Sequence, residues 1–146
     1  EFNQTKFITH HGITRYDHSM RVAYLSYKVS KVLRLNYKEV TEAALLHDFF
    51  LNEVDHENRA ERLRRHPEYA VNNASKYLDL SEMQKDIIRT HMFPVTFTPP
   101  KYLESWIVNL MDDVAALYEG GYRIHKELRA VSMLFVFFVV NFVKMR

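Results

Sequence analysis

The stretch Ala43-Ala44-Leu45-Leu46-His47-Asp48-Phe49-Phe50 decides how the fold of this chain is interpreted. A histidine and an aspartate stand side by side at the end of a run of small and aliphatic residues, in a segment that we expect to be helical. Burying an ionised carboxylate beside an imidazole costs several kcal/mol or more when neither has a further partner. A metal ion that binds both groups removes this cost, so the rest of the chain should supply further ligands.

Length and composition limit the classes of protein to which the chain can belong. Its 146 residues are most simply one domain, and 47% apolar residues with only three glycines and four prolines favour a helix-rich core. Because there is no cysteine, any metal must be held by His, Asp and Glu, and the lack of disulfides fits a cytoplasmic protein. The net charge of +2 is too small to indicate binding to a nucleic acid polymer.

A predicted helix that begins near Tyr16 precedes the doublet. His18 lies on one helical stripe of it with four aliphatic residues, Val22, Leu25, Val29 and Val32. A single histidine on such a stripe is more often a core residue bonded to a carbonyl than a metal ligand.

The doublet itself belongs to a second predicted helix. Asn36 can cap its N-terminus, and Glu39 follows three residues later, as in a capping box. The inward face is then formed by Val40, Ala44, His47 and Leu51. Both candidate ligands found so far therefore point towards the core.

Residues 52–65 are charged and nearly devoid of apolar side chains. We expect a solvated loop or an exposed helix. The alternative is that Arg59, Arg62, Arg64 or Arg65 reaches a phosphate at the rim of a site, because guanidinium groups bind phosphate oxygens in pairs.

Two further predicted helices carry a histidine each. His66-Pro67-Glu68 has the pattern of an N-cap followed by proline at the first helical position, so His66 is expected at a helix start. Ser81 and Gln84 form a capping box for the next helix, in which His91 falls on the apolar side and which Pro94 ends.

The segment from Leu103 to Leu117 is apolar around nearly its whole circumference, which predicts a central, buried helix that Gly120-Gly121 ends. It nevertheless carries Asp112-Asp113. A carboxylate in such a helix needs a partner, so one of this pair is the best remaining ligand candidate.

The last segment, residues 122–146, contains an apolar run from Ala130 to Val143. This run is shorter than the ~20 residues that a membrane-spanning helix requires. We expect it to form a helix that packs on the domain or on a second copy in a homodimer, with membrane association as the less favoured alternative.

Each histidine alone is explained as a core residue, but the set is not. Several helices that bring His and Asp side chains to one interior point would form a nitrogen and oxygen metal site. Such a site suits Fe, Mn, Zn or Mg.

The order His, His-Asp, Asp on successive helices resembles the HD-domain superfamily of metal-dependent phosphohydrolases, over about residues 10–120. The resemblance implies an all-α, single-domain bundle of about six helices. It also implies that the metal ligands are His18, His47, Asp48 and Asp112. We prefer Asp112 to Asp113 because it directly follows the run Val-Asn-Leu-Met, as the late aspartate of the family follows an aliphatic run.

His66 and His91 resemble the extra histidines with which some branches of the family hold a second ion, and Asp48 would then bridge the two. The chain departs from the family pattern at two places. Phe49-Phe50-Leu51-Asn52 follows the doublet where some relatives have Ile-Gly-Lys, and no Gly-Tyr-Pro follows His91, which speaks against the cyclic-di-GMP branch.

The resemblance implies hydrolysis of a phosphomonoester or phosphodiester of a nucleotide or similar small phosphorylated metabolite. One or two divalent ions, with Fe or Mn preferred, would activate water beside the catalytic Asp48. Arg15, Arg62 and Arg65 are the candidates for binding the substrate. Three acids, Asp17, Glu53 and Asp113, are candidates for carrying the leaving-group proton, and the sequence does not decide among them.

Two other classes of function stay open at this stage. The first is a regulatory module that holds a metal and binds a nucleotide without turnover. The second is a structural helical adaptor whose histidines are buried and hydrogen-bonded.

Overall fold

The computed structural model describes residues 14–50 and 58–120 of the chain. Within these ranges the backbone forms five helices and no β-strand, which confirms the all-α class that the sequence predicts. Four of them are α1 (Arg15–Val32), α2 (Tyr37–Leu46), α3 (Arg59–Ser75) and α4 (Glu82–Thr90). The fifth covers residues 103–120 and is called the last helix here.

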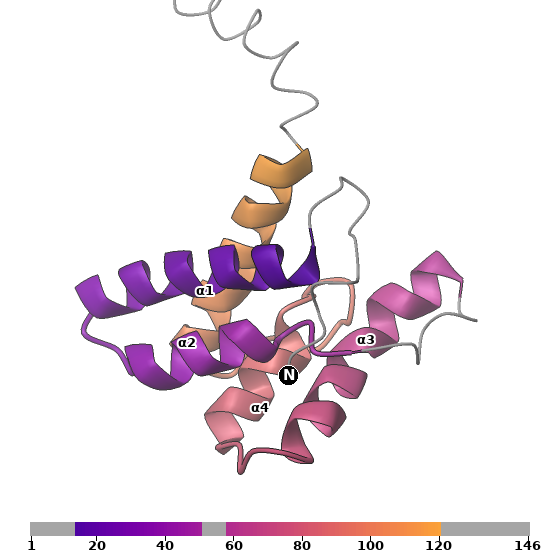
Figure 1. Cartoon of the computed structure of the whole chain (residues 1–146), viewed down its shortest axis with the longest axis horizontal. Coiled ribbons are helices and arrows are strands. Elements are labelled where there is room, and N and C mark those ends of the chain that lie inside the picture. The colour runs from indigo at the N-terminus through magenta and orange to yellow at the C-terminus, as the bar shows by residue number, and fades with distance from the viewer. Residues whose placement is uncertain (1–13, 51–57, 121–146) are drawn as a thin grey trace, which may run out of the picture.

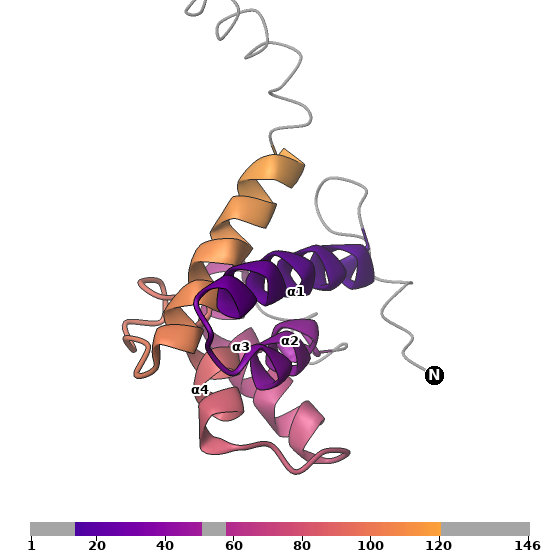
Figure 2. The same cartoon turned by 90° about the vertical axis from the view of Figure 1, so that its left-hand side faces the viewer.

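Helices α1 and α2 form an antiparallel pair that lies on one side of the bundle, and α3 and α4 lie beneath it (Figures 1 and 2). Each of these helices begins at a polar cap. The Thr14 and Asn36 side chains accept hydrogen bonds from the backbone amides of Asp17 and Glu39. The capping box expected at Ser81 and Gln84 is present at the start of α4.

The core is made of small and aliphatic side chains from all of the helices. Those with no exposed surface include Val22, Val40, Ala44, Ile87 and Val108. The last helix crosses α1 and α4 and projects beyond the bundle at its C-terminal end (Figures 1 and 2).

The buried face of α1 differs from the stripe predicted for it. His18 and Val22 are buried, but Leu25 and Val29 are half-buried, and Val32 is 81% exposed. The buried positions are filled largely by small residues, Ser19, Ala23, Ser26 and Ser30. Small side chains let α1 approach α2 closely, so the contact face is rotated towards them.

The predicted start of α3 is wrong. The helix begins at Arg59, with the Asn58 side chain accepting a hydrogen bond from the Glu61 amide at 3.0 Å. His66 and Pro67 therefore lie inside the helix. Proline removes one intrahelical donor, and the helix continues through this point nonetheless. Residues 59–65 thus form the first turns of a helix in which Ala60, Glu61, Arg64 and Arg65 are exposed. A helix was one of the two forms expected for this charged stretch.

The apolar composition of the last helix predicts burial all round, and this prediction is wrong. One face is buried and holds Ser105, Val108, Asp112, Ala115 and Glu119. The other face is exposed among the described residues, with Leu103, Trp106, Leu110 and Leu117 each at least 44% exposed. The helix is amphipathic, with an apolar outer face instead of a polar one.

Several expectations fall outside the described residues. These are the place of Leu51 on the α2 face, the role of Gly121 at a helix end, and the packing of residues 122–146 on the domain or on a second copy. The division into a single domain over residues 1–146 likewise stays a prediction. Among the helices that the structure describes, none has the length and apolar character needed to cross a membrane.

Candidate metal centre

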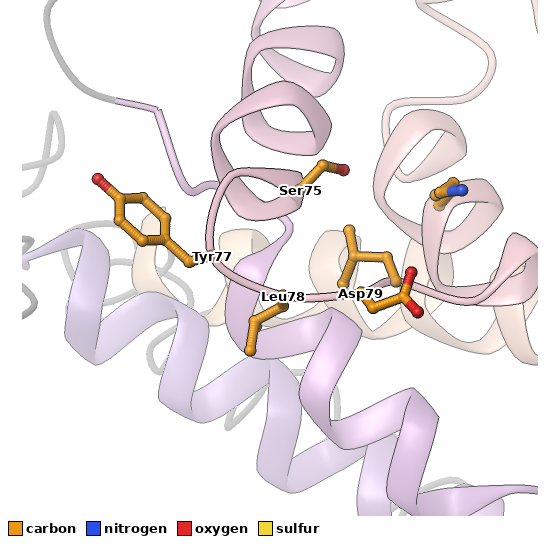
Figure 3. Close-up of a pocket in the computed structure, with 6 residues that line it drawn as sticks. Ser75, Tyr77, Leu78 and Asp79 are labelled. Atoms are coloured by element: carbon orange, nitrogen blue, oxygen red, sulfur yellow. The ribbon is translucent and has the colours of Figure 1, made fainter.

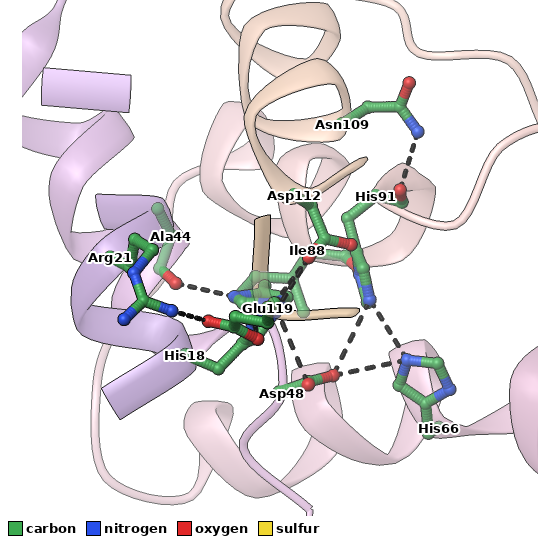
Figure 4. Close-up of polar contacts among 11 residues, drawn as sticks. His18, Arg21, Ala44, Asp48, His66, Ile88, His91, Asn109, Asp112 and Glu119 are labelled. Atoms are coloured by element: carbon green, nitrogen blue, oxygen red, sulfur yellow. Dashed lines mark hydrogen bonds and ion pairs between the residues drawn. The ribbon is translucent and has the colours of Figure 1, made fainter. Parts of the chain in front are cut away.

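Six side chains that the sequence singles out lie around one point in the interior (Figure 4). His18 comes from α1 and His66 from α3, while His91 directly follows α4 and Asp112 comes from the last helix. The doublet was expected within a helix, but α2 ends at Leu46, with His47 as its C-cap and Asp48 in the following turn. The turn lets the two neighbouring residues face the same point.

The first group of these side chains is centred on Asp112. Its Oδ1 lies 2.8 Å from Nε2 of His18 and 3.6 Å from Nε2 of His47. The same nitrogen of His47 is 3.8 Å from Oδ2 of Asp48. Three of these ligand atoms, from His18, His47 and Asp112, lie within 4.8 Å of one another.

The second group lies on the other side of Asp48. Nε2 of His66 and Nε2 of His91 are 3.0 Å apart, and Oδ1 of Asp48 is 3.3 Å from the first and 3.7 Å from the second. The two oxygens of Asp48 therefore face different groups of histidines. This is the geometry of a carboxylate placed between two neighbouring cation positions.

The donor set fits a divalent metal. Two atoms that bind one ion at ~2.1 Å lie about 3.0–3.4 Å apart, close to the spacings observed here. Nε2 of His47 is fully buried and has no hydrogen-bond partner among the described residues. An orphaned nitrogen in the interior is costly unless something binds it, and a metal ion does so. The nitrogen and carboxylate donors suit Fe, Mn, Zn or Mg.

The backbone holds three of the imidazole rings in the orientation that such a site needs. In each, Nδ1 lies within hydrogen-bond distance of a carbonyl three or four residues earlier, at 2.7 Å for His47 to Ala44, 2.9 Å for His66 to Arg62 and 2.7 Å for His91 to Ile88. A carbonyl only accepts, so Nδ1 carries the proton. The lone pair of Nε2 is then directed to the centre of the cluster.

Burial and charge shift the ionisation of these groups in opposite directions. Burial lowers the pKa of His18, but the hydrogen bond and charge of Asp112 outweigh it and raise that pKa to about 9. Burial likewise acts to lower the pKa of His47, but the charges of Asp48 and Asp112 outweigh it, so this pKa is raised. His91 packs against the rings of His47 and His66, and its burial and their positive charge lower its pKa to about 3.

The two aspartates stay ionised at neutral pH. Burial acts to raise the pKa of Asp48 and of Asp112, but the surrounding histidines outweigh it and hold both well below the usual range. Asp113, the alternative ligand, is exposed, and slight burial and the charge of Asp112 raise its pKa. The side chain of Asp112 is the one that faces the cluster.

Two residues of the last helix that the sequence analysis missed also contact the cluster (Figure 4). Glu119 is only 5% exposed, lies 2.8 Å from Nδ1 of His18 and accepts from the Arg21 guanidinium. Asn109 donates to the carbonyl of His91 at 2.6 Å. Asn109 lies three residues before Asp112 and Glu119 seven after it, which places all three on one helical face. This spacing is the signal that could have found the two residues.

The three arginines predicted to bind substrate differ in their surroundings. Arg15 donates to the carbonyl of Phe50 at 2.5 Å, and its guanidinium lies 3.8 Å above that ring, which in turn packs on His66. Nε of Arg62 is buried with no hydrogen-bond partner in the described residues. Arg65 is exposed and lies over Tyr69. Of the three, Arg15 is linked to the cluster through Phe50 and His66.

Two surface pockets formed by described residues lie away from this centre. One, of about 360 Å³, lies at the connection between α3 and α4 and is lined by Ser75, Tyr77, Leu78 and Asp79 among others (Figure 3). A second, of about 250 Å³, is almost wholly apolar and lies between α1 and α2. Neither is lined by any of the six clustered side chains.

The fold and the site place the protein in a class of helical proteins in which histidines and aspartates meet at a candidate metal centre inside the bundle. The chain belongs to the HD-domain family: the family model described as the HD domain matches residues 15–117, well over half of the chain. HD domains are in general metal-dependent hydrolases. No curated protein and no solved structure gives a significant match to the chain.

Proposed function

We propose that the protein is a metal-dependent phosphohydrolase that cleaves a phosphomonoester or phosphodiester of a nucleotide or similar small phosphorylated metabolite. The observation that carries this proposal is the convergence of His18, Asp48 and Asp112 on the buried Nε2 of His47, which has no hydrogen-bond partner among the described residues. Membership of the HD-domain family supports it independently. The substrate class is part of the proposal and follows from the family resemblance.

We assign one ion to the group of His18, His47 and Asp112 and a second to the group of His66 and His91, with Asp48 between them. Fe or Mn is the preferred metal for this donor set, with Zn or Mg as alternatives. When bound, a divalent ion lowers the pKa of a water molecule and so supplies a nucleophile for attack at phosphorus.

The chain's own residues would then admit and hold the substrate. The Asp48 side chain is 19% exposed, more than the other five, so the cluster opens to solvent beside it. Arg15 borders this opening through Phe50, which packs on His66, and Arg62 lies one turn before His66 on α3. Their guanidinium groups would bind phosphate oxygens and offset the negative charge that develops during transfer. Asp17 and Asp113 remain the described candidates for protonating the leaving group.

The experiment is a turnover assay with metal-loaded protein against a panel of nucleoside phosphates, cyclic nucleotides and cyclic dinucleotides. Phosphate release and nucleotide products are measured for the wild type, for Asp48→Asn and for Asp79→Asn. Asp48→Asn should lower kcat/KM by more than about 100-fold, because it removes the charge between the two groups of histidines. Asp79 is exposed and lies at the α3–α4 connection, so its variant should keep the wild-type rate.

The outcomes separate the classes of function. Turnover that Asp48→Asn abolishes supports the hydrolase. Nucleotide binding by fully metallated protein with no turnover of any compound would replace it with a regulatory binding module. Protein purified with Mn or Fe that contains no metal would favour the structural adaptor.

A further inference from the structure

Glu119 is a buried carboxylate for which the proposed reaction has no direct use. It lies seven residues after Asp112 on the last helix and is 5% exposed. A buried carboxylate persists only where its charge is compensated. Two groups compensate it here, both from α1: the imidazole of His18 and the guanidinium of Arg21 (Figure 4).

The contact with Glu119 gives a proton on Nδ1 of His18 a charged acceptor. Nδ1 lies 2.8 Å from Oε2 of Glu119, and a carboxylate paired with arginine acts as an acceptor only. The proton is therefore held on Nδ1. Nε2 lies 2.8 Å from Oδ1 of Asp112, which is also a carboxylate oxygen, so in the absence of metal it donates a second proton there. When an ion is bound by Nε2 and Asp112, the proton that remains on the ring is the one on Nδ1.

His18 differs in this respect from the other three histidines of the cluster. Nδ1 of His47, His66 and His91 contacts a backbone carbonyl of its own helix or turn. His18 instead depends on a side chain 101 residues away in the sequence. A charged acceptor also strengthens the imidazole as a donor to metal more than a neutral carbonyl does.

Arg21 supports Glu119 from the side that faces solvent. It lies one turn after His18 on α1, its side chain is 33% exposed, and its guanidinium contacts Oε1 of Glu119 and lies 5.1 Å from the Tyr118 ring. One carboxylate oxygen is thus bound to each of two residues on the same face of α1. This pairing limits the positions that the carboxylate can take up.

We propose that Glu119, held by Arg21, is a positioning residue that selects the tautomer of His18 in which Nε2 faces the metal. The inference rests on the proposed function, because it assumes that His18 binds a metal ion. It predicts that the site loses affinity when the carboxylate is removed although every ligand is still present. Loss of an outer partner of a histidine ligand typically lowers metal affinity 10- to 100-fold.

The test uses the full chain in four forms: wild type, Glu119→Ala, Glu119→Gln and Arg21→Ala. Mn²⁺ affinity is measured by titration. The protonation of each ring nitrogen of His18 is measured by long-range ¹H–¹⁵N correlation of Zn²⁺-loaded protein with ¹⁵N-labelled histidine, since Zn²⁺ is diamagnetic. Glu68→Ala is the matched control, because Glu68 is also paired with an arginine, Arg89, but its side chain is 55% exposed.

Glu119→Ala should weaken Mn²⁺ binding 10- to 100-fold and change the ¹⁵N signals of His18. Glu119→Gln retains an acceptor, so it should keep the Nδ1–H tautomer and lose only part of the affinity. Arg21→Ala should cause a smaller loss than Glu119→Ala and leave the tautomer unchanged. If Glu119→Ala fails to fold, the isosteric Glu119→Gln decides through its affinity alone, and Glu68→Ala should match the wild type.

The inference is overturned if the wild type binds Mn²⁺ and both Glu119→Gln and Glu119→Ala bind it with the affinity of the wild type. It is also overturned if Arg21→Ala and Glu119→Ala cause the same loss with an unchanged tautomer, because the pair would then only join α1 to the last helix. A wild type that binds no divalent metal overturns the proposed function and this inference together. The two failures are therefore distinguishable.

Discussion

Asp112 and Asp113 are neighbours in the sequence, but only Asp112 faces the cluster. Asp112 is 9% exposed and contacts His18, whereas Asp113 lies on the exposed side of the same helix. The aliphatic run before Asp112 favours it in the sequence, and helix geometry explains why only one of the two carboxylates faces the cluster. Consecutive residues point about 100° apart, so both cannot face one point.

These two residues provide a matched pair of variants. Asp112→Asn should lower the affinity for Mn²⁺ by more than about tenfold, because a charged ligand candidate becomes a neutral amide. Asp113→Asn should leave the affinity within a factor of about two. Titration calorimetry of both variants measures this. Equal losses in the two variants would remove Asp112 from the proposed ligand set.

The pH dependence of metal binding is a second prediction at the scale of residues. Only the neutral imidazole binds a metal, and the pKa of His18 is raised to about 9 while that of His47 is raised as well. Asp48 and Asp112 are ionised throughout this range. The apparent affinity for Mn²⁺ should therefore rise with pH up to about 9, by up to about tenfold per pH unit for each proton displaced. An affinity that stays constant from pH 6.5 to 8.5 would contradict this.

At the scale of elements, the serines on the buried face of α1 are a distinctive feature. The hydroxyls of Ser19, Ser26 and Ser30 are buried and have no hydrogen-bond partner in the described part of the chain. An unsatisfied buried hydroxyl is destabilising. We therefore expect Ser26→Ala to raise the free energy of unfolding by about 1 kcal/mol.

Urea unfolding followed by circular dichroism measures this change. Ser26→Val should instead destabilise the protein by about 1–3 kcal/mol, since it adds volume where α1 meets α2. Ser75→Ala, at an exposed helical position, is the control and should change stability by less than about 0.5 kcal/mol. A loss of stability in Ser26→Ala would show that its hydroxyl has a partner after all.

The existence of the helices was predictable from local sequence, and the site was predictable in part. Caps at Asn36 and Ser81 identify helix starts because they act within one turn. The start of α3 was missed because Asn58 lies in a charged stretch, while His66-Pro67 has the pattern of a start that tertiary packing overrides. Glu119 escaped notice because its partners, His18 and Arg21, lie about a hundred residues away in the sequence.

At the scale of the whole molecule, the cluster connects all five described helices. Each helix either carries a residue of the cluster or ends directly before one, as α2 does before His47 and α4 before His91. Burial and the positive charge of the neighbouring histidines lower the pKa of His91 to about 3. Protonated rings at this point repel one another and so oppose the arrangement. A bound cation should thus stabilise the fold as well as supply chemistry.

The stability of the whole chain should accordingly depend on metal. A divalent ion at about 1,000 times its dissociation constant should raise the free energy of unfolding by about 4 kcal/mol. The melting temperature with Mn²⁺ should exceed that with chelator by roughly 10 °C or more. Scanning calorimetry measures both, and Asp48→Asn should show little of this shift. Identical melting temperatures with and without chelator would count against an ion in the core.

The central claim is that imidazoles and carboxylates distant in the sequence hold a divalent ion inside the bundle. The measurement that tests it most directly is anomalous diffraction from crystals of the protein loaded with Mn²⁺. The account predicts an anomalous peak ~2.0–2.4 Å from Nε2 of His18, Nε2 of His47 and a carboxylate oxygen of Asp112, with a second peak beside His66 and His91 when two ions bind. Fully loaded crystals with no anomalous peak among these residues would contradict it.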